Sequence, residues 1–213
     1  MIAPANTVHP LRRARISREK LHGAFVSLAS KGLTPDLRAN AYGLGVAEVS
    51  TIAAEAGHTH ALLSEGAESP SVLERASEGS TQWLQSDQPW LTFEADVVSL
   101  KRVPEDTPVS YGYQYRTPRD TTLALVSVGY ADGVPRTASF SAHMALRGDL
   151  HAIAGRIAMD QCVLDIGDAG CELGETIVVW GNEPRLEQWS HWSGRSPELL
   201  VSHLAARVVR VWE

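Results

Sequence analysis

The chain has 213 residues, 44% of them hydrophobic, which is enough to bury the core of one domain or of two small ones. Its formal net charge is −6 and its Lys and Arg residues are scattered, which argues against a nucleic-acid-binding protein. No apolar run is long enough to span a membrane, and the two cysteines lack metal-binding spacing. We therefore predict a cytoplasmic protein without a membrane segment, a bound metal or a nucleic-acid partner.

Helical and extended segments alternate through the first part of the chain. Ser17 can cap a helix in which Leu21, Phe25 and Leu28 follow at helical spacing, and Gly32 ends it. The pattern then predicts a strand over 33–38, a helix over 46–57, a strand over 59–64, a helix over 70–76 and a strand over 81–85. Such an alternation is typical of a parallel sheet or a β/α barrel.

The pattern changes at the polar link of residues 86–89, where we place a domain boundary between residues 1–89 and 90–213. From Leu91 the apolar residues alternate with polar ones, and the alternation slips at Val97-Val98 as a β-bulge would cause. Further strands are expected over 122–128, 144–147, 152–157, 162–166, 176–180 and 207–212, with a helix beginning at Ser196-Pro197. Short strands at this spacing predict a mostly antiparallel β-domain.

The most distinctive stretch is Arg38-Ala39-Asn40-Ala41-Tyr42-Gly43-Leu44-Gly45, which links a predicted strand to a predicted helix. Its two glycines permit backbone conformations that other residues rarely adopt, and the helix that follows offers N–H groups to an anion such as phosphate. The stretch resembles the cofactor-lysine motif of the alanine racemases, Lys-Ala-Asn-Ala-Tyr-Gly-His-Gly, at six of eight positions. That family uses pyridoxal 5'-phosphate, which implies Tyr42 near the cofactor phosphate.

Arg38 occupies the position of the family's Schiff-base lysine. A guanidinium stays protonated and is a poor nucleophile, so Arg38 is not competent to hold the cofactor covalently. Two interpretations remain open. The side chain can pair with a nearby carboxylate, or it can contact a phosphate or carboxylate of a ligand without chemistry.

The second half of the chain also resembles the alanine racemases, over five segments in family order. They are Val109-Ser110-Tyr111-Gly112, Tyr115-Arg116-Thr117-Pro118-Arg119-Asp120, Val128 to Arg136, Gly155 to Gln161, and Gly174-Glu175 before Val178 to Gly181. The resemblance implies that Tyr130 is an acid/base residue that reaches across a dimer interface, and that Met159 lies near the substrate carboxylate. A structural role for Tyr130 and ordinary packing for Met159 are the alternatives.

The chain departs from the family in two further ways. A (β/α)₈ barrel takes about 250 residues, whereas only 89 precede Trp90, which is room for about three β/α units. The sequence also has Pro197-Glu198-Leu199 where the family has Pro-Tyr-Glu with a phosphate-binding tyrosine, and a carboxylate there repels phosphate. We predict a three-unit remnant of a TIM-type barrel followed by an alanine racemase C-terminal-type β-domain. Its open sheet edges call for a homodimer or another protein partner, with a helix or the N-terminal arm of the same chain as the alternative cover.

Three functions follow from the resemblance. The first is an alanine racemase-like protein that lacks racemase activity and acts as a binding or regulatory homologue. The second is an active pyridoxal-phosphate-dependent racemase, interconverting L- and D-alanine in D-alanine biosynthesis, whose site is completed by another chain. The third is a non-catalytic binder of a small amino acid or a phosphate near Arg38, Tyr42 and Tyr130.

Overall fold

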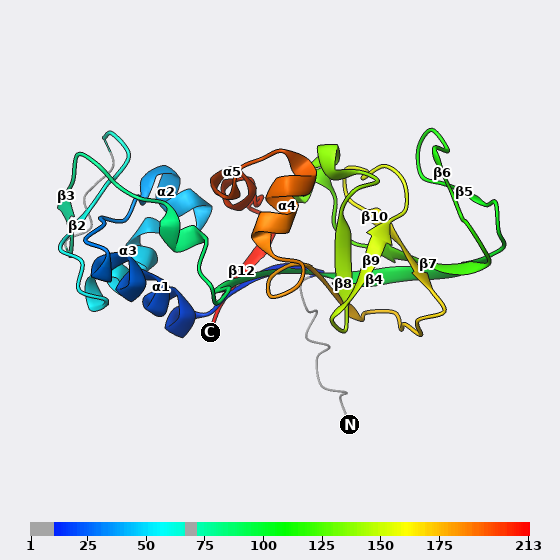
Figure 1. The fold of residues 1–213 in the computed structure, drawn as a ribbon, viewed down its shortest axis with the longest axis horizontal. Coiled ribbons are helices and arrows are strands. Elements are labelled where there is room, and N and C mark those ends of the chain that lie inside the picture. The colour runs from blue at the N-terminus through cyan, green and yellow to red at the C-terminus, as the bar shows by residue number, and fades with distance from the viewer. Residues whose placement is uncertain (1–10, 67–71) are drawn as a thin grey trace, which may run out of the picture.

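The computed structural model describes residues 11–66 and 72–213. The molecule is elongated, with a helical N-terminal lobe at one end and a large β-structure at the other (Figure 1). Helices α4 (Leu186–Ser193) and α5 (Pro197–Ser202) lie between these two parts. Within the described ranges, no helix combines the length and the apolar character needed to cross a membrane.

The N-terminal lobe contains the two predicted amphipathic helices, α1 (Arg18–Ser30) and α3 (Val46–Glu55). Helix α1 begins where predicted because the Ser17 hydroxyl accepts the backbone N–H of Lys20 at 3.3 Å. The spacing of the apolar residues places one face of each helix in the core. The buried residues include Leu21, Phe25 and Leu28 of α1 and Val49, Ile52 and Ala53 of α3.

Short parallel segments form the centre of this lobe. Strand β2 (His60–Ala61) pairs in parallel with β3 (Glu74–Arg75). Isolated parallel bridges join Asp36 to Leu62 and Pro35 to Ser80. The segments therefore lie in the order 80, 35–36, 60–62 and 74–75, and their parallel direction agrees with the predicted β/α units.

Three predicted elements of this lobe need correction. The strand predicted over 33–38 is reduced to two bridges, because the backbone turns left-handed directly after it. The described part of the helix predicted over 70–76 contains strand β3, since pairing with β2 overrides a short helical pattern; residues 70 and 71 lie outside the described residues. The strand predicted over 81–85 is the 3₁₀ helix η1 (Gln82–Leu84).

Trp83 explains why residues 82–84 form the 3₁₀ helix η1 in place of the predicted strand. Its indole is buried at 1% exposure, and the indole N–H donates to the backbone oxygen of Asp36 at 3.1 Å. The ring centroid lies 5.2 Å from that of Phe25, 6.1 Å from that of Tyr42 and 5.5 Å from that of Trp90. A single turn of 3₁₀ helix places this large side chain in the core beneath the parallel segments, which an extended strand would not do.

The β-structure is an eight-stranded sheet in the order β11-β8-β9-β10-β7-β4-β1-β12. An additional pairing between β11 and β4 closes six of these strands into a barrel-like ring, so the predicted antiparallel β-domain is present. The strands are β1 (Arg12–Ile16), β4 (Leu91–Val103), β7 (Thr121–Val126), β8 (His143–Leu146), β9 (Asp149–Ile153), β10 (Cys162–Gly167), β11 (Thr176–Trp180) and β12 (Val209–Trp212). A separate hairpin joins β5 (Pro108–Val109) to β6 (Tyr115–Arg116).

The sheet contains the predicted bulge and a strand from the first part of the chain. The pairing of β4 with β7 shifts register between Val97 and Ser99, which confirms the predicted bulge. Strand β1 pairs with β4 and with β12, so a segment from before residue 89 is part of the large sheet. The division of the chain into domains 1–89 and 90–213 stays a prediction, but hydrogen bonds link the first segment to the second.

Candidate functional site

The turn that follows the first parallel segment has an unusual backbone. Residues Ala39, Asn40, Ala41 and Tyr42 of α2 (Arg38–Gly43) have φ values of 52°, 57°, 51° and 56°, so the chain makes a left-handed turn. This conformation costs roughly 1–2 kcal/mol for each non-glycine residue and persists only where the surroundings hold it. The Asn40 side chain accepts the N–H of Val46 at 2.8 Å, and the Ser64 hydroxyl accepts the N–H of Ala39 at 2.8 Å.

The guanidinium of Arg38 is paired with the carboxylate of Asp36. Arg38 Nη2 lies 2.6 Å from Asp36 Oδ2, and Nε lies 3.0 Å from Oδ1. Asp36 is 1% exposed. Burial raises the pKa of its carboxyl, but the hydrogen bonds from Arg38 outweigh burial, so the pKa lies below its ordinary value. The structure thus shows the first of the two interpretations of Arg38, pairing with a nearby carboxylate.

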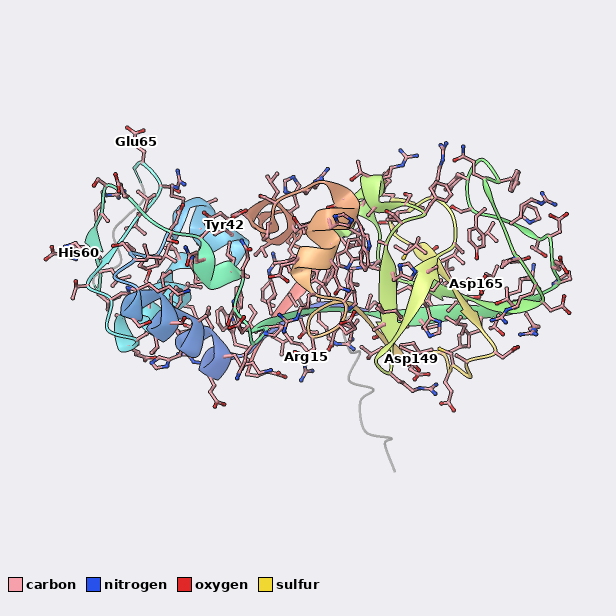
Figure 2. All side chains as sticks on the ribbon, in the orientation of Figure 1. Arg15, Tyr42, His60, Glu65, Asp149 and Asp165 are labelled. Carbon is pink, nitrogen blue, oxygen red and sulfur yellow. The ribbon has the colours of Figure 1, made fainter. Side chains whose placement is uncertain are left out.

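Tyr42 lies on the side of the N-terminal lobe that faces the centre of the molecule (Figure 2). Its side chain is 8% exposed, and burial together with the charge of Asp36 raises the pKa of its hydroxyl. Glu198 of α5 contributes to this effect. The Glu198 carboxylate accepts a hydrogen bond from the Thr81 hydroxyl at 2.7 Å, so it joins α5 to the N-terminal lobe.

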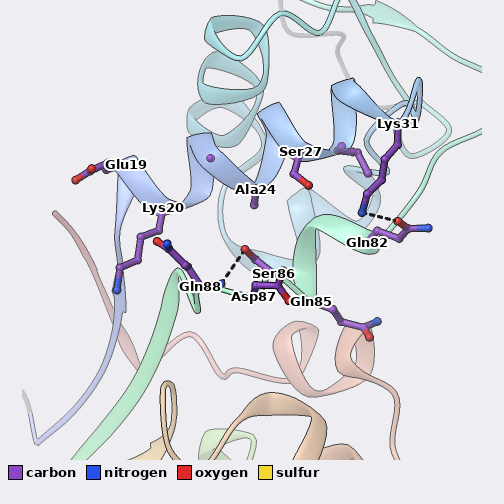
Figure 3. A pocket seen from close by; sticks show the side chains of 12 residues that line it. Glu19, Lys20, Ala24, Ser27, Lys31, Gln82, Gln85, Ser86, Asp87 and Gln88 are labelled. Atoms are coloured by element: carbon purple, nitrogen blue, oxygen red, sulfur yellow. Dashed lines mark hydrogen bonds between the residues drawn. The ribbon is translucent and has the colours of Figure 1, made fainter.

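These residues do not fit a covalently bound pyridoxal phosphate. The three lysines of the chain are Lys20, Lys31 and Lys101. Lys20 and Lys31 line a hollow of about 450 Å³ between α1 and residues 82–88 (Figure 3), and Lys101 lies on the exposed part of β4. None of them replaces the amine that Arg38 lacks. Two carboxylates near Tyr42 also oppose a phosphate, and the first N–H of α3 is already bonded to Asn40.

Tyr130 and Met159 form a separate pair on the β-structure. Tyr130 begins the 3₁₀ helix η2 (Tyr130–Asp132), and its N–H donates to Ala158 O at 3.0 Å. A Cβ on Gly129 would lie 2.4 Å from the same oxygen, so only glycine permits this approach. Tyr130 is 40% exposed and Met159 is 53% exposed. The fold thus brings Tyr130 close to Met159 and Arg38 close to Tyr42, but no contact joins the two pairs within the described residues.

A second displayed tyrosine, Tyr111, was not among the site residues predicted from the sequence. It is 71% exposed and lies in the loop between β5 and β6, where Ser110, Gly112 and Tyr113 have positive φ values of 61°, 82° and 51°. The Ser110 hydroxyl donates to Arg156 O at 2.7 Å and fixes this loop beside the Met159 segment. Strained loops of this kind concentrate at functional sites. Tyr111 is therefore a competing candidate for the role that the resemblance implied for Tyr130.

The pattern of the sequence could have pointed to Tyr111, because it lies in the first of the five family-like segments. Asp36 was not predicted as a site residue either, and no local signal distinguishes it, since its role depends on its burial beside Trp83 and on its ion pair with Arg38. The predicted absence of a metal site is not tested by this structure. Within residues 11–66 and 72–213, no group of three or more His, Cys, Asp or Glu side chains could hold a metal ion.

Comparison with known proteins identifies the family. Residues 90–212 match the family model "Alanine racemase, C-terminal domain", which is more than half of the chain. This chain belongs to the alanine racemase family. Among curated racemases, it is 42% identical to one from Streptomyces coelicolor over 129 residues and 40% identical to one from Frankia casuarinae over 127 residues. These matches cover 59% and 58% of this chain but only 33% of each relative, so the chain spans about a third of their length.

Solved racemase structures share the fold. The alanine racemase from Streptomyces coelicolor superposes with a TM-score of 0.81 at 20% identity, covering 94% of this chain and 97% of the other. One from Bartonella henselae with covalently bound pyridoxal phosphate gives a TM-score of 0.81 at 15% identity, covering 95% and 99%. The structural match runs almost from end to end, whereas the sequence match is confined to about a third of the curated relatives. At these identities the structural likeness shows the fold alone.

Proposed function

We propose that this alanine racemase family member lacks racemase activity and acts as a binding or regulatory homologue. The observation that supports this proposal most directly is the Arg38–Asp36 ion pair. An imine can form only from a neutral amine, and a guanidinium bonded to a buried carboxylate at 2.6 Å is neither neutral nor free to attack an aldehyde.

Racemisation also needs two groups that exchange protons on opposite faces of the substrate carbon. In the family one of these groups is the cofactor lysine, and the resemblance implied a tyrosine for the other. The chain retains displayed tyrosines, Tyr111 and Tyr130, but no amine faces them from Arg38. Loss of one of the two groups supports an inactive protein. The chain retains Met159, which the resemblance places near the substrate carboxylate, so a small amino acid is the ligand that we propose.

We also propose a homodimer. Five large side chains with apolar bodies are exposed on the loops of the β-structure, and exposed apolar surface of this kind marks interaction sites. These residues are Tyr111, Tyr113, Tyr130, Phe140 and Met159. A second copy that places this surface on the Arg38 lobe would bring the two separated halves of the site together.

The N-terminal lobe is proposed to be a remnant of a TIM-type barrel. Its support is the parallel order of segments 80, 35–36, 60–62 and 74–75, and the two helices α1 and α3 that alternate with them. Trp83 fills the core below these segments. The lobe therefore has a packed interior with far fewer strands than a closed barrel needs.

The test is a search for the cofactor bond and for turnover in the same sample. Purified protein is mixed with pyridoxal phosphate, its visible spectrum is recorded, and borohydride reduction is followed by peptide mass spectrometry. L-Alanine is then supplied and D-alanine is measured. We expect no aldimine band, no pyridoxyl-lysine at Lys20, Lys31 or Lys101, and no D-alanine.

The Arg38→Lys variant is the matched comparison, because it restores the amine at the position of the family lysine. We expect it to bind the cofactor weakly at most and to remain inactive, since the Glu198 carboxylate still opposes the phosphate. Pyridoxyl attached to a lysine of the unmodified chain, together with interconversion of the alanine enantiomers, would refute the proposal.

A further inference from the structure

A hollow of about 410 Å³ opens beside Tyr130, at the junction of the β-structure with α5. Its lining includes Arg136, Arg195 and His203, with Tyr130 and Gly133 from the η2 turn. No Asp or Glu side chain is among its lining residues. Positive groups therefore converge on a concave surface of a chain whose formal net charge is −6.

The nearby carboxylates do not neutralise these positive groups. Asp132 is fully buried and is held by Arg12 at 3.1 Å and by Arg207 at 2.6 Å. Asp160 pairs with Arg207 at 2.7 Å. Neither Arg136 nor Arg195 forms an ion pair with any carboxylate of the described residues. Their charges are available to a ligand.

Backbone contacts hold the walls of the hollow in place. A Cβ on Gly133 would lie 2.5 Å from His203 O, so the η2 turn is in close contact with the end of α5. Arg195 lies between helices α4 and α5, and its carbonyl oxygen accepts the Ser190 hydroxyl at 2.6 Å. A site whose backbone is already ordered loses less conformational entropy when a ligand binds.

The polar groups of the hollow suit an acid. The Arg136 guanidinium lies 5.8 Å from the centroid of the Tyr130 ring, which limits its orientation while leaving its N–H groups free to donate. The Tyr130 hydroxyl makes no hydrogen bond within the described part of the chain and can donate as well. His203 Nδ1 donates to Leu199 O at 2.7 Å, and a proton on its other nitrogen would add a further positive charge.

We propose that this hollow binds a small anion, a carboxylate or a phosphate, between the guanidinium groups of Arg136 and Arg195. Planar guanidinium groups bind both kinds of acid through paired N–H···O bonds. The proposal does not depend on whether the chain retains racemase activity, because none of these contacts involves Arg38 or the cofactor. A different experiment therefore tests it.

The full chain is titrated with inorganic phosphate and, separately, with succinate at low ionic strength, and binding is followed by calorimetry and by NMR signals of the arginine side chains. Comparison of the two probes decides between phosphate and carboxylate. We expect Arg195→Gln and Arg136→Gln each to weaken binding of the preferred probe about tenfold or more, the loss typical of a charge-assisted hydrogen bond. Tyr130→Phe is expected to weaken binding less.

Arg102→Gln is the matched control, because it removes one positive charge from an arginine paired with Asp168 at 2.7 Å on another part of the molecule. It should leave the affinity unchanged. Circular dichroism of each variant checks that the fold is retained. Absence of binding to both probes, or an equal loss of affinity in Arg102→Gln, would overturn the proposal.

A carboxylate of a second copy offers the same chemistry as a free anion, and sedimentation separates the two sources. If a second copy occupies the hollow, Arg195→Gln will weaken self-association, and phosphate will bind less tightly as the protein concentration rises. That result would replace the small-anion site with a protein contact. Self-association that is unchanged by Arg195→Gln, together with concentration-independent phosphate binding, supports the site proposed.

Discussion

Arg38, which stands where the family has its cofactor lysine, forms an ion pair with Asp36, two positions before it. Asp36 ends the first parallel segment, and Arg38, two residues later and just before the left-handed turn, bonds with it. The carboxylate is buried, so without the guanidinium it would keep few partners. The ion pair thus stabilises this lobe. It also engages the Arg38 guanidinium, which stands at the position of the family's Schiff-base lysine.

Arg38→Gln is expected to lower the free energy of unfolding at pH 7 by about 1–2 kcal/mol, a modest value because the Arg38 side chain is more than half exposed. The hydrogen bonds from Arg38 hold the pKa of Asp36 below its ordinary value, although burial raises it. The carboxylate therefore stabilises the fold above the unfolded pKa, about 4, and this contribution disappears as the pH falls through the lowered native pKa.

The Arg38→Gln variant lacks the hydrogen bonds that lower the pKa of Asp36. Burial still raises this pKa, so the pKa of Asp36 should be higher in the variant than in the unmodified chain. Acid unfolding of Arg38→Gln should then begin at a higher pH than in the unmodified chain. Urea denaturation across the acid range measures both effects. Arg102→Gln, whose partner Asp168 is exposed, is the control and should change stability by less than about 0.5 kcal/mol. Equal stability of the two variants would contradict the role given to the Asp36 pair.

At the scale of elements, a short 3₁₀ helix closes the N-terminal lobe. Helix η1 places Trp83 among Phe25, Tyr42 and Trp90, and the indole N–H groups of Trp83 and Trp90 donate to backbone oxygens. This aromatic cluster connects α1, the left-handed turn and the start of β4. It supplies the packed interior that a few short parallel segments could not form alone.

Trp83→Ala should therefore destabilise the chain by about 3–5 kcal/mol, the range seen when a large buried aromatic side chain is removed. The N-terminal lobe should be affected most, so its amide protons should exchange faster than those of the β-structure. Chemical denaturation and hydrogen exchange measure the two effects. Tyr113→Ala removes a side chain that is 69% exposed and should change stability by at most about 0.5 kcal/mol. A similar loss in both variants would contradict a core role for Trp83.

At the scale of the whole molecule, the two parts are connected through the sheet. Strand β1 lies between β4 and β12 in the sheet order, and its residues Ala14 and Ile16 are fully buried. Glu198 of α5 adds a hydrogen bond to Thr81 of the N-terminal lobe. The β-structure therefore depends on a strand that precedes the helical lobe in the sequence.

A fragment of residues 90–213 should lose much of the stability of the β-structure, because β12 would then have no neighbour in the sheet. Hydrogen exchange should be fast in Val209–Trp212, while the closed ring of β4, β7 and β10 remains protected. A synthetic peptide of residues 11–18 added in excess should restore protection to β12. A fragment with the same protection pattern as the full chain would show that β1 is dispensable.

Much of the architecture could be predicted from local pattern. Helices α1 and α3 follow from periodicity and capping residues, because each depends on neighbours within a few positions. Strand β11 and the bulge in β4 pair with distant strands, but the alternation of apolar and polar residues already indicates them. The predictions were wrong for two elements whose form depends on distant partners, the helix expected over 70–76 and the strand expected over 81–85. Strand β3 requires β2, and η1 forms because Trp83 packs against residues far away in the sequence.

For the site, the sequence by itself determined that Arg38 replaces the lysine and that the chain belongs with the alanine racemases, since both are matters of residue identity and order. Only the tertiary structure decided that Asp36 holds Arg38, that the loop displaying Tyr111 is bonded to Arg156, and that Arg136 and Arg195 meet at one hollow. The reason is physical. Hydrogen bonds and charges act over a few ångströms, and folding brings together residues such as Arg136 and Arg195 that lie far apart in the chain.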